Sequence, residues 1–154
     1  MLFLSPQLRR DIQTAVSFLT TRVKKPDEDD WGQLKRALKY LKETRRLKLT
    51  LMIESVDVIK WFVDGSHNTH WDCKGHGSAM MAMGCGAISS YSRRIKVNTR
   101  SSTETELVLV DAYMPEVLWS LYFIQAQGYG VKYAEIHQDN VSAQMLESYS
   151  HCQD

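Results

Sequence analysis

The sequence has little of what marks secreted, membrane-spanning or strongly basic proteins. It holds three cysteines in 154 residues, and its 19 Lys and Arg nearly balance its 18 Asp and Glu. An odd, small set of cysteines (Cys73, Cys85 and Cys152) does not suit a disulfide framework and fits free thiols in a reducing compartment. A formal net charge of +1 gives no argument from composition for a nucleic-acid or membrane partner.

Long hydrophobic runs are also scarce. The longest mostly apolar stretch, 49–63, is interrupted by Glu54, Asp57 and Lys60, and it is shorter than the roughly 20 residues of a membrane span. The first residues lack the basic and apolar regions of a signal peptide. We therefore expect a soluble, intracellular protein, in the cytoplasm or nucleus, that is not secreted and has no membrane partner. The 44% hydrophobic content suffices for one globular domain.

The first 48 residues have helical patterning. Apolar residues at three- and four-residue spacing predict a helix over 6–23, ended by Pro26: Leu8, Ile12, Val16, Leu19 and Val23. The acidic run Asp27–Asp30 predicts the start of a second helix. Its expected buried seam is Trp31, Leu34, Leu38 and Leu41, and its later part is basic: Lys35, Arg36, Lys39, Lys42, Arg45, Arg46 and Lys48. The two helices are expected to form an antiparallel hairpin.

After residue 47 the pattern changes to alternation and β-branched residues, which predicts sheet. We expect extended chain over 47–53, a buried strand over 56–63, a loop over 65–77, and strands near 78–83 and 87–91, the second with 95–98 as its continuation. Capping motifs from Ser101 onward predict a long helix that ends at Gly128. Its expected buried stripe comprises Leu107, Val110, Met114, Val117 or Leu118, Leu121 and Ile124, with a kink or break at Pro115. A strand over 133–137, a turn and a helix over 141–149 follow.

Three acidic residues lie at the ends of predicted elements. Asp64 ends a strand, Glu106 lies in the first turns of the long helix, and Asp139 ends another strand. Carboxylates placed in this way can converge and bind Mg²⁺ together with substrate phosphates. The alternative is purely structural, because Asp-Gly and Asp-Asn are common turn dipeptides and Glu106 fits a helix cap.

Four blocks of the sequence resemble the ribonuclease H region of copia-type retrotransposon polyproteins, in the family's order. They are Asp29–Trp31 with Leu34–Thr44, Val63–Ser66, Ser101–Leu107 and Gln138–Ala143. Residues 11–19 are similar to the segment that joins the reverse transcriptase to this region. The resemblance covers nearly the whole chain, and the SSTETE and DNVSA blocks are its most specific part.

The resemblance implies an α+β (α/β) fold of the ribonuclease H type, with a mixed sheet and packed helices after an N-terminal helical hairpin. It divides the chain into a connecting segment, 1–48, and a ribonuclease H-like domain, 49–154. It implies hydrolysis of the RNA strand of RNA:DNA hybrids during reverse transcription, as part of a polyprotein. The implied ligands of two Mg²⁺ ions, with Mn²⁺ as an alternative, are Asp64, Glu106 and Asp139, and Glu104 is the fallback for Glu106.

The chain also departs from that family. The family's final strand, last helix and fourth catalytic position are expected beyond the end of this sequence, and Asp154 is not assigned to that position. No polymerase motif is present. We therefore expect a fragment or decayed copy, truncated at both ends. The alternative to a ribonuclease H is an inactive retroelement remnant that binds nucleic acid or protein at most.

The nucleic-acid contacts expected from the sequence are basic and polar. Lys35, Arg36, Lys39 and Lys42 can follow a phosphate backbone, although a solvated amphipathic face explains them as well. Further expected contacts are Arg93, Arg94 and Asn140, the last within the DNVSA block. The aromatic residues in apolar runs are expected to be core: Trp61, Phe62, Trp119, Tyr122 and Phe123.

One competing metal site is a zinc-binding loop. His67, His70, Cys73 and His76 follow one another at three-residue intervals, Cys85 lies beyond them, and Asp72 is in the same loop. All but Asp72 are common zinc ligands. The spacing matches no known zinc finger, and we expect incidental polar loop residues.

Overall fold

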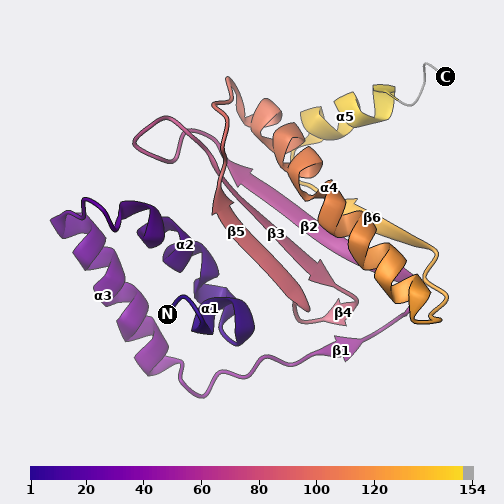
Figure 1. The fold of residues 1–154 in the computed structure, drawn as a ribbon, viewed down its shortest axis with the longest axis horizontal. Coiled ribbons are helices and arrows are strands. Elements are labelled where there is room, and N and C mark those ends of the chain that lie inside the picture. The colour runs from indigo at the N-terminus through magenta and orange to yellow at the C-terminus, as the bar shows by residue number, and fades with distance from the viewer. Residues whose placement is uncertain (151–154) are drawn as a thin grey trace.

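The computed structural model describes the backbone of residues 1–150 and the side chains of residues 1–145. Cys152 and Asp154 lie outside the described residues. A four-stranded mixed sheet is at the centre, with the long helix α4 on one side of it and an N-terminal helical segment at its other edge (Figure 1). This is the expected α+β arrangement of a ribonuclease H-like fold.

The sheet has the strand order β5-β3-β2-β6. Strands β2 (Val58–Ser66), β3 (His76–Ala82) and β5 (Ser89–Arg94) form an antiparallel meander, and β6 (Tyr133–His137) pairs in parallel with β2. A separate two-stranded ladder joins β1 (Met52–Ile53) to β4 (Gly84–Cys85). Buried and more exposed residues alternate along β2, so one face of this strand packs in the core and the other is open.

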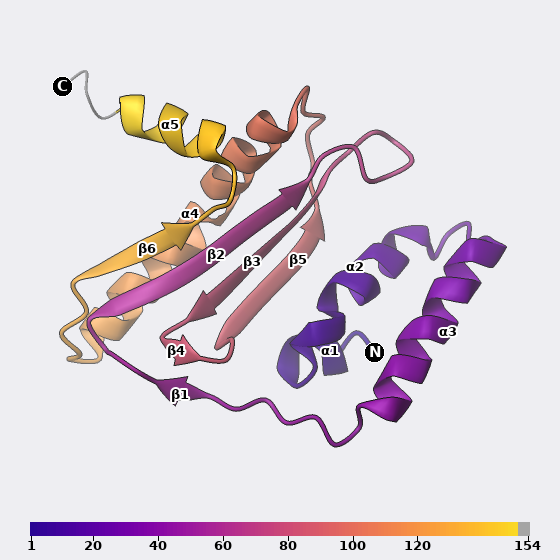
Figure 2. The same cartoon turned by 180° about the vertical axis from the view of Figure 1, so that it is seen from behind.

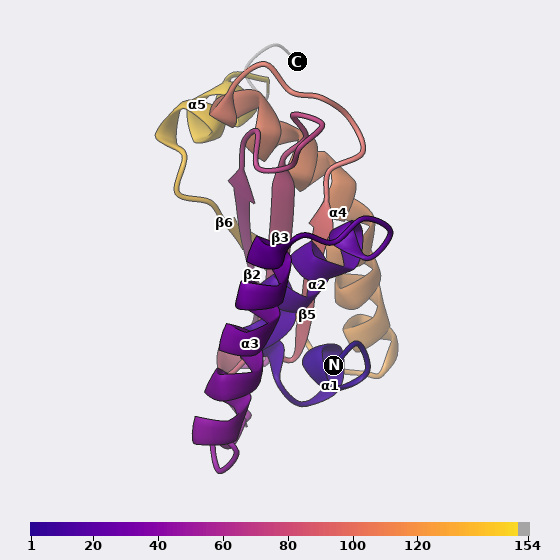
Figure 3. The ribbon, with the colours of Figure 1, turned by 90° about the vertical axis from the view of Figure 1, so that its left-hand side faces the viewer.

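Helix α4 (Ser102–Ala126) lies on the core side of the strands (Figure 3). Its fully buried side chains include Leu109 and Tyr113, which pack with Ile59, Trp61 and Val63 of β2. The expected stripe was only partly right, since Val110 and Val117 are buried but Thr105, Leu109, Tyr113 and Ser120 line the same face. A break at Pro115 was wrong, because the helix runs through it.

The N-terminal helix predicted over 6–23 is divided in the structure. It consists of α1 (Leu4–Gln7), a 3-10 turn (Arg10–Ile12) and α2 (Gln13–Arg22). Arg9 explains the interruption, because its guanidinium turns inward to donate to Asp11 and to the Thr44 hydroxyl and carbonyl. Ile12 and Val16 are buried as expected, whereas Leu8 and Val23 are exposed.

Helix α3 (Glu28–Glu43) begins at the predicted acidic cap. Asp27 accepts from the Asp30 backbone N–H, and the Asp30 side chain accepts from the Asp27 backbone N–H, which is a capping box. Its predicted seam was partly wrong, because Trp31 and Leu38 are exposed and Asp30 and Ala37 are buried instead. Arg22 of α2 binds Asp30, so an ion pair joins the hairpin where an apolar seam was expected.

Two predicted strand segments are absent from the described structure. Residues 47–51 have no regular structure, and 95–98 follow β5 without being part of a strand. Leu49 and Leu51 are exposed, whereas Ile95 is buried in the core and its backbone N–H donates to the Gly75 carbonyl at 2.9 Å. The loop predicted over 65–77 is shorter than expected, because β2 continues to Ser66 and β3 begins at His76.

Helix α2 lies along β5 at the edge of the sheet (Figure 2). The Gln13 amide donates to the Ser90 carbonyl at 3.0 Å, and the Ser17 hydroxyl donates to the Ser92 carbonyl at 2.7 Å. These bonds satisfy backbone acceptors that an edge strand would otherwise leave free for another chain. The N-terminal segment therefore protects one edge of the sheet.

Two buried histidines connect the same helix to the loop between β2 and β3. His70 Nε2 lies 3.0 Å from His76 Nδ1, and His76 Nε2 lies 2.8 Å from the Ser92 hydroxyl. Phe18 of α2 stacks on His70. Burial lowers the pKa of His70, and burial together with the charge of His70 lowers the pKa of His76 to about 4. Arg94 and Asp72 are the charged groups that act on His70.

We expect the free energy of unfolding to fall as the pH drops from about 6.5 towards 4. In that window the unfolded state takes up a proton at His76 that the folded state does not, so acid favours unfolding. For a shift from 6.5 to about 4, the loss approaches about 3 kcal/mol. Urea titrations at several pH values measure it. His76→Gln should flatten the curve and His137→Gln, at an exposed histidine, should not; equal curves for all three proteins would contradict the assignment.

Helix α4 is also the one described helix that is long and apolar enough to cross a membrane, by length and composition alone. The statement from the sequence that 49–63 is the longest mostly apolar stretch was therefore wrong. Core helices of soluble proteins pass the same test, and α4 buries one side against the sheet.

Candidate metal centre

Three carboxylates meet at one end of the sheet. Asp64 lies near the end of β2, Glu106 in the first turns of α4, and Asp139 just after β6, and one ligand oxygen of each lies within 4.8 Å of the others. Because β2 and β6 are parallel neighbours, their ends fall at the same edge. The structure therefore brings together the three residues that the sequence analysis selected.

Close packing of α4 against the sheet places Glu106. A Cβ on Gly65 would lie 2.2 Å from Leu109 Cδ1, and a Cβ on Gly77 would lie 2.0 Å from Leu109 Cδ2. Neither position therefore accepts a side chain unless the Leu109 side chain moves, and the two glycines leave the space that Leu109 of α4 occupies against β2 and β3. Glycine at position 65 has the further consequence that its backbone N–H reaches Glu106.

The Glu106 carboxylate is buried and held on both oxygens. The Gly65 backbone N–H donates to Oε1 at 3.0 Å, and the Gln138 amide donates to Oε2 at 3.4 Å. Burial raises the pKa of Glu106, and the neighbouring charges of Asp64 and Asp139 raise it further, while the two hydrogen bonds oppose them. A divalent cation at this point would offset the same repulsion.

Glu104, the fallback ligand, has a different role. Its carboxylate accepts from the Arg100 backbone N–H at 2.6 Å, and its own backbone N–H donates to the Ser101 hydroxyl. This is a helix cap, with Glu104 directed away from the carboxylate cluster. The geometry thus supports the choice of Glu106.

The donor set fits a hard divalent cation. Three carboxylates within 4.8 Å of one another offer only oxygen, the ligand that Mg²⁺ and Mn²⁺ accept, and provide no thiol or imidazole for zinc. Asp64 and Asp139 are exposed, which leaves room for water and a phosphate beside a bound ion. Asp64, Asp139 and Glu106 are the residues that would hold it.

The zinc-binding loop is not assembled as a site. His70 and His76 bind each other, and His67 bonds the hydroxyls of Thr99 and Thr105. Cys73 and Cys85 are exposed free thiols. Asp72 pairs with Arg94 at 2.9 Å. Within the part of the chain that the structure describes, the carboxylate cluster is the only group of three or more metal-binding side chains.

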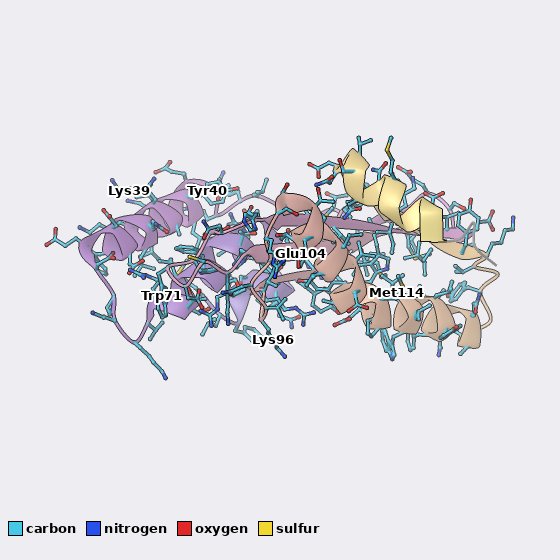
Figure 4. All side chains as sticks on the ribbon, turned by 90° about the horizontal axis from the view of Figure 1, so that it is seen from above. Lys39, Tyr40, Trp71, Lys96, Glu104 and Met114 are labelled. Atoms are coloured by element: carbon cyan, nitrogen blue, oxygen red, sulfur yellow. The ribbon has the colours of Figure 1, made fainter. Side chains whose placement is uncertain are left out.

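The basic residues of α3 lie away from the carboxylates. Figure 4 shows Lys39 projecting from α3 at one end of the molecule, whereas Glu104, which marks the start of α4, lies near the middle. Lys35 sits over the Trp31 ring of its own helix. A duplex held at the carboxylates would have to extend along the molecule to reach Lys35, Arg36, Lys39 and Lys42.

The other expected nucleic-acid contacts have structural partners. Arg93 lies over the Tyr113 ring and donates to the Ala112 carbonyl, and Arg94 pairs with Asp72. The Asn140 side chain accepts from the Ala143 backbone N–H and so caps α5 (Val141–Ser150). Each of these residues thus has a local structural role that was not predicted from the sequence.

The prediction that the aromatic residues in apolar runs are core was wrong for four of five. Trp61 is buried, but Phe62 is 39% exposed, and Trp119, Tyr122 and Phe123 are more exposed still. Phe62 follows the alternation of β2, which directs it to the open face of the sheet. That alternation was the signal in the sequence that pointed to its exposure.

Comparison with known proteins finds a plant relative. The chain is 32% identical over 116 residues to "Uncharacterized mitochondrial protein AtMg00810" of Arabidopsis thaliana, a match that covers 73% of this chain and 47% of that protein. The chain therefore spans about half the length of the curated relative it matches. No family model matches the chain, and no solved structure matches it.

Proposed function

We propose that this chain is a retroelement-derived ribonuclease H that hydrolyses the RNA strand of RNA:DNA hybrids with two Mg²⁺ ions. The observation that carries the proposal is the convergence of Asp64, Glu106 and Asp139 within 4.8 Å on a ribonuclease H-like sheet. These are the three positions to which the resemblance to copia-type polyproteins assigns metal ligands. Residues far apart in the sequence had to be placed together by the fold.

The chemistry follows from the position of each carboxylate. Bound Mg²⁺ supplies an activated water and stabilises the departing oxygen of a phosphodiester. Asp64 and Asp139 project from the exposed strand ends, where they can hold ions against a phosphate. The Glu106 carboxylate accepts from the Gly65 backbone N–H and from the Gln138 amide, and these bonds orient it beside the two aspartates.

The proposal includes partners and a location. The substrate is an RNA:DNA hybrid, and the chain works beside the rest of a retroelement polyprotein, inside the cell. The N-terminal segment, α1 to α3, corresponds to the proposed connection to a reverse transcriptase. Side chains of this segment also donate hydrogen bonds to backbone carbonyls of the edge strand β5.

The test is cleavage of a hybrid that carries different labels on its RNA and DNA strands. With Mg²⁺, purified residues 1–154 should cut only the RNA strand, and EDTA should stop the reaction. A DNA duplex and a single-stranded RNA of the same sequence serve as controls. Equal cleavage with EDTA would point to a contaminating nuclease and contradict the assignment.

The alternative is an inactive remnant that binds nucleic acid or a protein. A folded preparation that binds the hybrid but cuts nothing with Mg²⁺ or Mn²⁺ would favour this alternative. Circular dichroism and a cooperative urea transition establish folding before that conclusion is drawn.

A further inference from the structure

Positive and negative charges are divided between the two parts of the chain. Residues 1–48 hold twelve Lys and Arg against six Asp and Glu, whereas residues 49–154 hold seven Lys and Arg against twelve Asp and Glu. The net charge of +1 thus consists of +6 in the helical segment and −5 in the rest of the chain. Such a division indicates a polyanionic partner for the basic part.

Most of the positive charge of the helical segment lies on α3 and just after it. The seven basic side chains there are all exposed: Lys35, Arg36, Lys39, Lys42, Arg45, Arg46 and Lys48. Among the side chains of residues 1–145, none of these seven is in an ion pair, whereas Arg9, Arg22 and Arg94 all bind carboxylates. Their charges are therefore not neutralised within the described structure.

Three of these lysines form a stripe on the outer face of α3. Lys35, Lys39 and Lys42 are spaced by four and then three residues, so they lie on one side of the helix. Ala37, which is buried, lies on the opposite side. The stripe from Lys35 to Lys42 is about 10 Å long, which is the length of about three nucleotides along one strand of a duplex.

The stability of the helix does not account for this stripe. Cations near the C-terminal end of a helix interact favourably with its dipole, which explains Lys42 in the last turn. Lys35 and Lys39 lie earlier in the helix, and like charges four residues apart repel each other. The Lys35 ammonium lies 5.2 Å from the centroid of the Trp31 ring, a contact that does not neutralise its charge. A polyanion against this face would relieve the repulsion.

The chemistry of this face favours a nucleic-acid backbone over a membrane. The apolar side of α3, with Leu34, Ala37 and Leu41, is at least partly buried and packs against α2. It is therefore not free to enter a lipid bilayer, and the exposed Trp31 and Leu38 do not make a second apolar face. A row of cations along the outside of a helix suits the phosphates of an extended backbone, which attract Lys whatever the sequence of the bases.

We propose that the outer face of α3, centred on Lys35, Lys39 and Lys42, binds the phosphate backbone of a nucleic-acid duplex away from the carboxylates. Figure 4 shows Lys39 at one end of the molecule and Glu104, at the start of α4, near the middle, so the two surfaces contact different parts of the duplex. Binding at α3 needs no metal ion and does not depend on base sequence. The inference rests on the proposed function, which identifies the polyanion as a duplex, and α3 then retains the hybrid while the carboxylates act on it.

The test is the binding of a fluorescently labelled DNA duplex as a function of NaCl concentration, without divalent ions. The metal-free carboxylates repel a duplex, so they add nothing to the affinity that is measured. For B-DNA, the slope of log K against log[NaCl] is about −0.9 for each phosphate contact. The slope should become shallower by about 0.9 for Lys39→Gln and by about 2.7 when Lys35 and Lys42 are changed to Gln as well. The affinity of this triple variant at low salt should fall by roughly tenfold or more.

Lys132 provides a matched control. It is exposed and lies 3.5 Å from Asp57, at the edge of the sheet where β2 and β6 begin and therefore opposite the carboxylates. Lys132→Gln carries the same change in net charge as Lys39→Gln and should keep the wild-type slope. Gln is as good a helix former as Lys, so α3 should persist in the variants, and circular dichroism with a urea transition checks that each one folds.

The cleavage assay gives a second measurement. With Mg²⁺ and a long RNA:DNA hybrid, the triple variant should have a higher KM and an unchanged kcat, because α3 does not touch the reacting phosphate. Lys132→Gln should change neither constant.

The outcomes separate this inference from the proposed function. If the wild type cuts the hybrid but the triple variant keeps its slope and its KM, the α3 surface is overturned and the ribonuclease proposal stands. If the slope changes as expected and no hybrid is cut, the surface stands and the enzyme proposal falls. Equal changes in Lys39→Gln and Lys132→Gln would overturn the surface, because the effect would then follow net charge alone. A folded wild type that binds phosphatidylserine vesicles but no duplex would overturn it as well, in favour of a membrane.

Discussion

Replacing Asp139 by Asn should abolish metal-dependent cleavage and leave the metal-free protein at least as stable as the wild type. Loss of one ligand removes several kcal/mol of transition-state stabilisation, and each 1.36 kcal/mol is a factor of ten in rate. We therefore expect the rate of hybrid cleavage to fall by at least roughly a hundredfold. Initial rates at saturating Mg²⁺, corrected for the folded fraction, measure this.

The same substitution should separate function from stability. Three carboxylates within 4.8 Å of one another repel when no cation is present, so neutralising one of them relieves repulsion in the folded state. The thermal midpoint of metal-free Asp139→Asn should equal or exceed that of the wild type. Added Mg²⁺ should raise the midpoint of the wild type, because the ion binds only the folded site, and should raise that of the variant much less.

The exposed carboxylate of Asp111, elsewhere on α4, gives a matched control. Asp111→Asn carries the same change in net charge but lies outside the cluster. It should keep the wild-type rate and the wild-type response to Mg²⁺. If Asp139→Asn also kept its rate within about tenfold, or kept its full thermal response to Mg²⁺, Asp139 would not be a ligand of the working ion.

The convergence of the three carboxylates could be predicted in part, because each one follows a local signal in the sequence and the resemblance to copia-type polyproteins selects the same three residues. Each carboxylate follows a recognisable signal: the end of an apolar strand for Asp64, a helix cap for Glu106 and a strand-to-helix turn for Asp139. Parallel pairing of β2 and β6 then places two of these ends side by side. The hydrogen bonds from Gly65 and Gln138 were not predictable, since they depend on how closely α4 approaches the sheet.

The helical segment shows where local patterns fail. Its apolar periodicity predicted one helix and an apolar seam, but the long-range bond from Arg9 to Thr44 divides the first helix, and the Arg22–Asp30 pair joins the two helices. Each contact uses an arginine side chain that a periodic pattern assigns to solvent. The packing of α2 along β5 could likewise not be predicted from the sequence, because nothing in the sequence around Gln13 and Ser17 indicates that they bond an edge strand.

The largest expected effect on stability comes from Trp61→Ala. Trp61 is 1% exposed in the core between β2 and α4, stacks on Tyr91, and donates its indole N–H to the Ser120 hydroxyl at 3.3 Å. Truncation of a buried aromatic side chain to Ala costs about 3–5 kcal/mol through lost burial and a residual cavity. Since whole domains are stable by about 5–15 kcal/mol, urea denaturation should show a large fall in midpoint.

Trp61→Phe serves as the matched variant, because it keeps an aromatic ring and loses only the indole N–H and part of the volume. Ser120 also donates to the Val117 carbonyl at 2.8 Å, so its hydroxyl is not left unpaired, and the cost should stay clearly below that of Ala. Trp61 points to the opposite face of β2 from Asp64. Cleavage per folded molecule should therefore remain within a few-fold of the wild type in both variants. A destabilisation below about 1 kcal/mol for Trp61→Ala would show that β2 and α4 are not packed through this side chain.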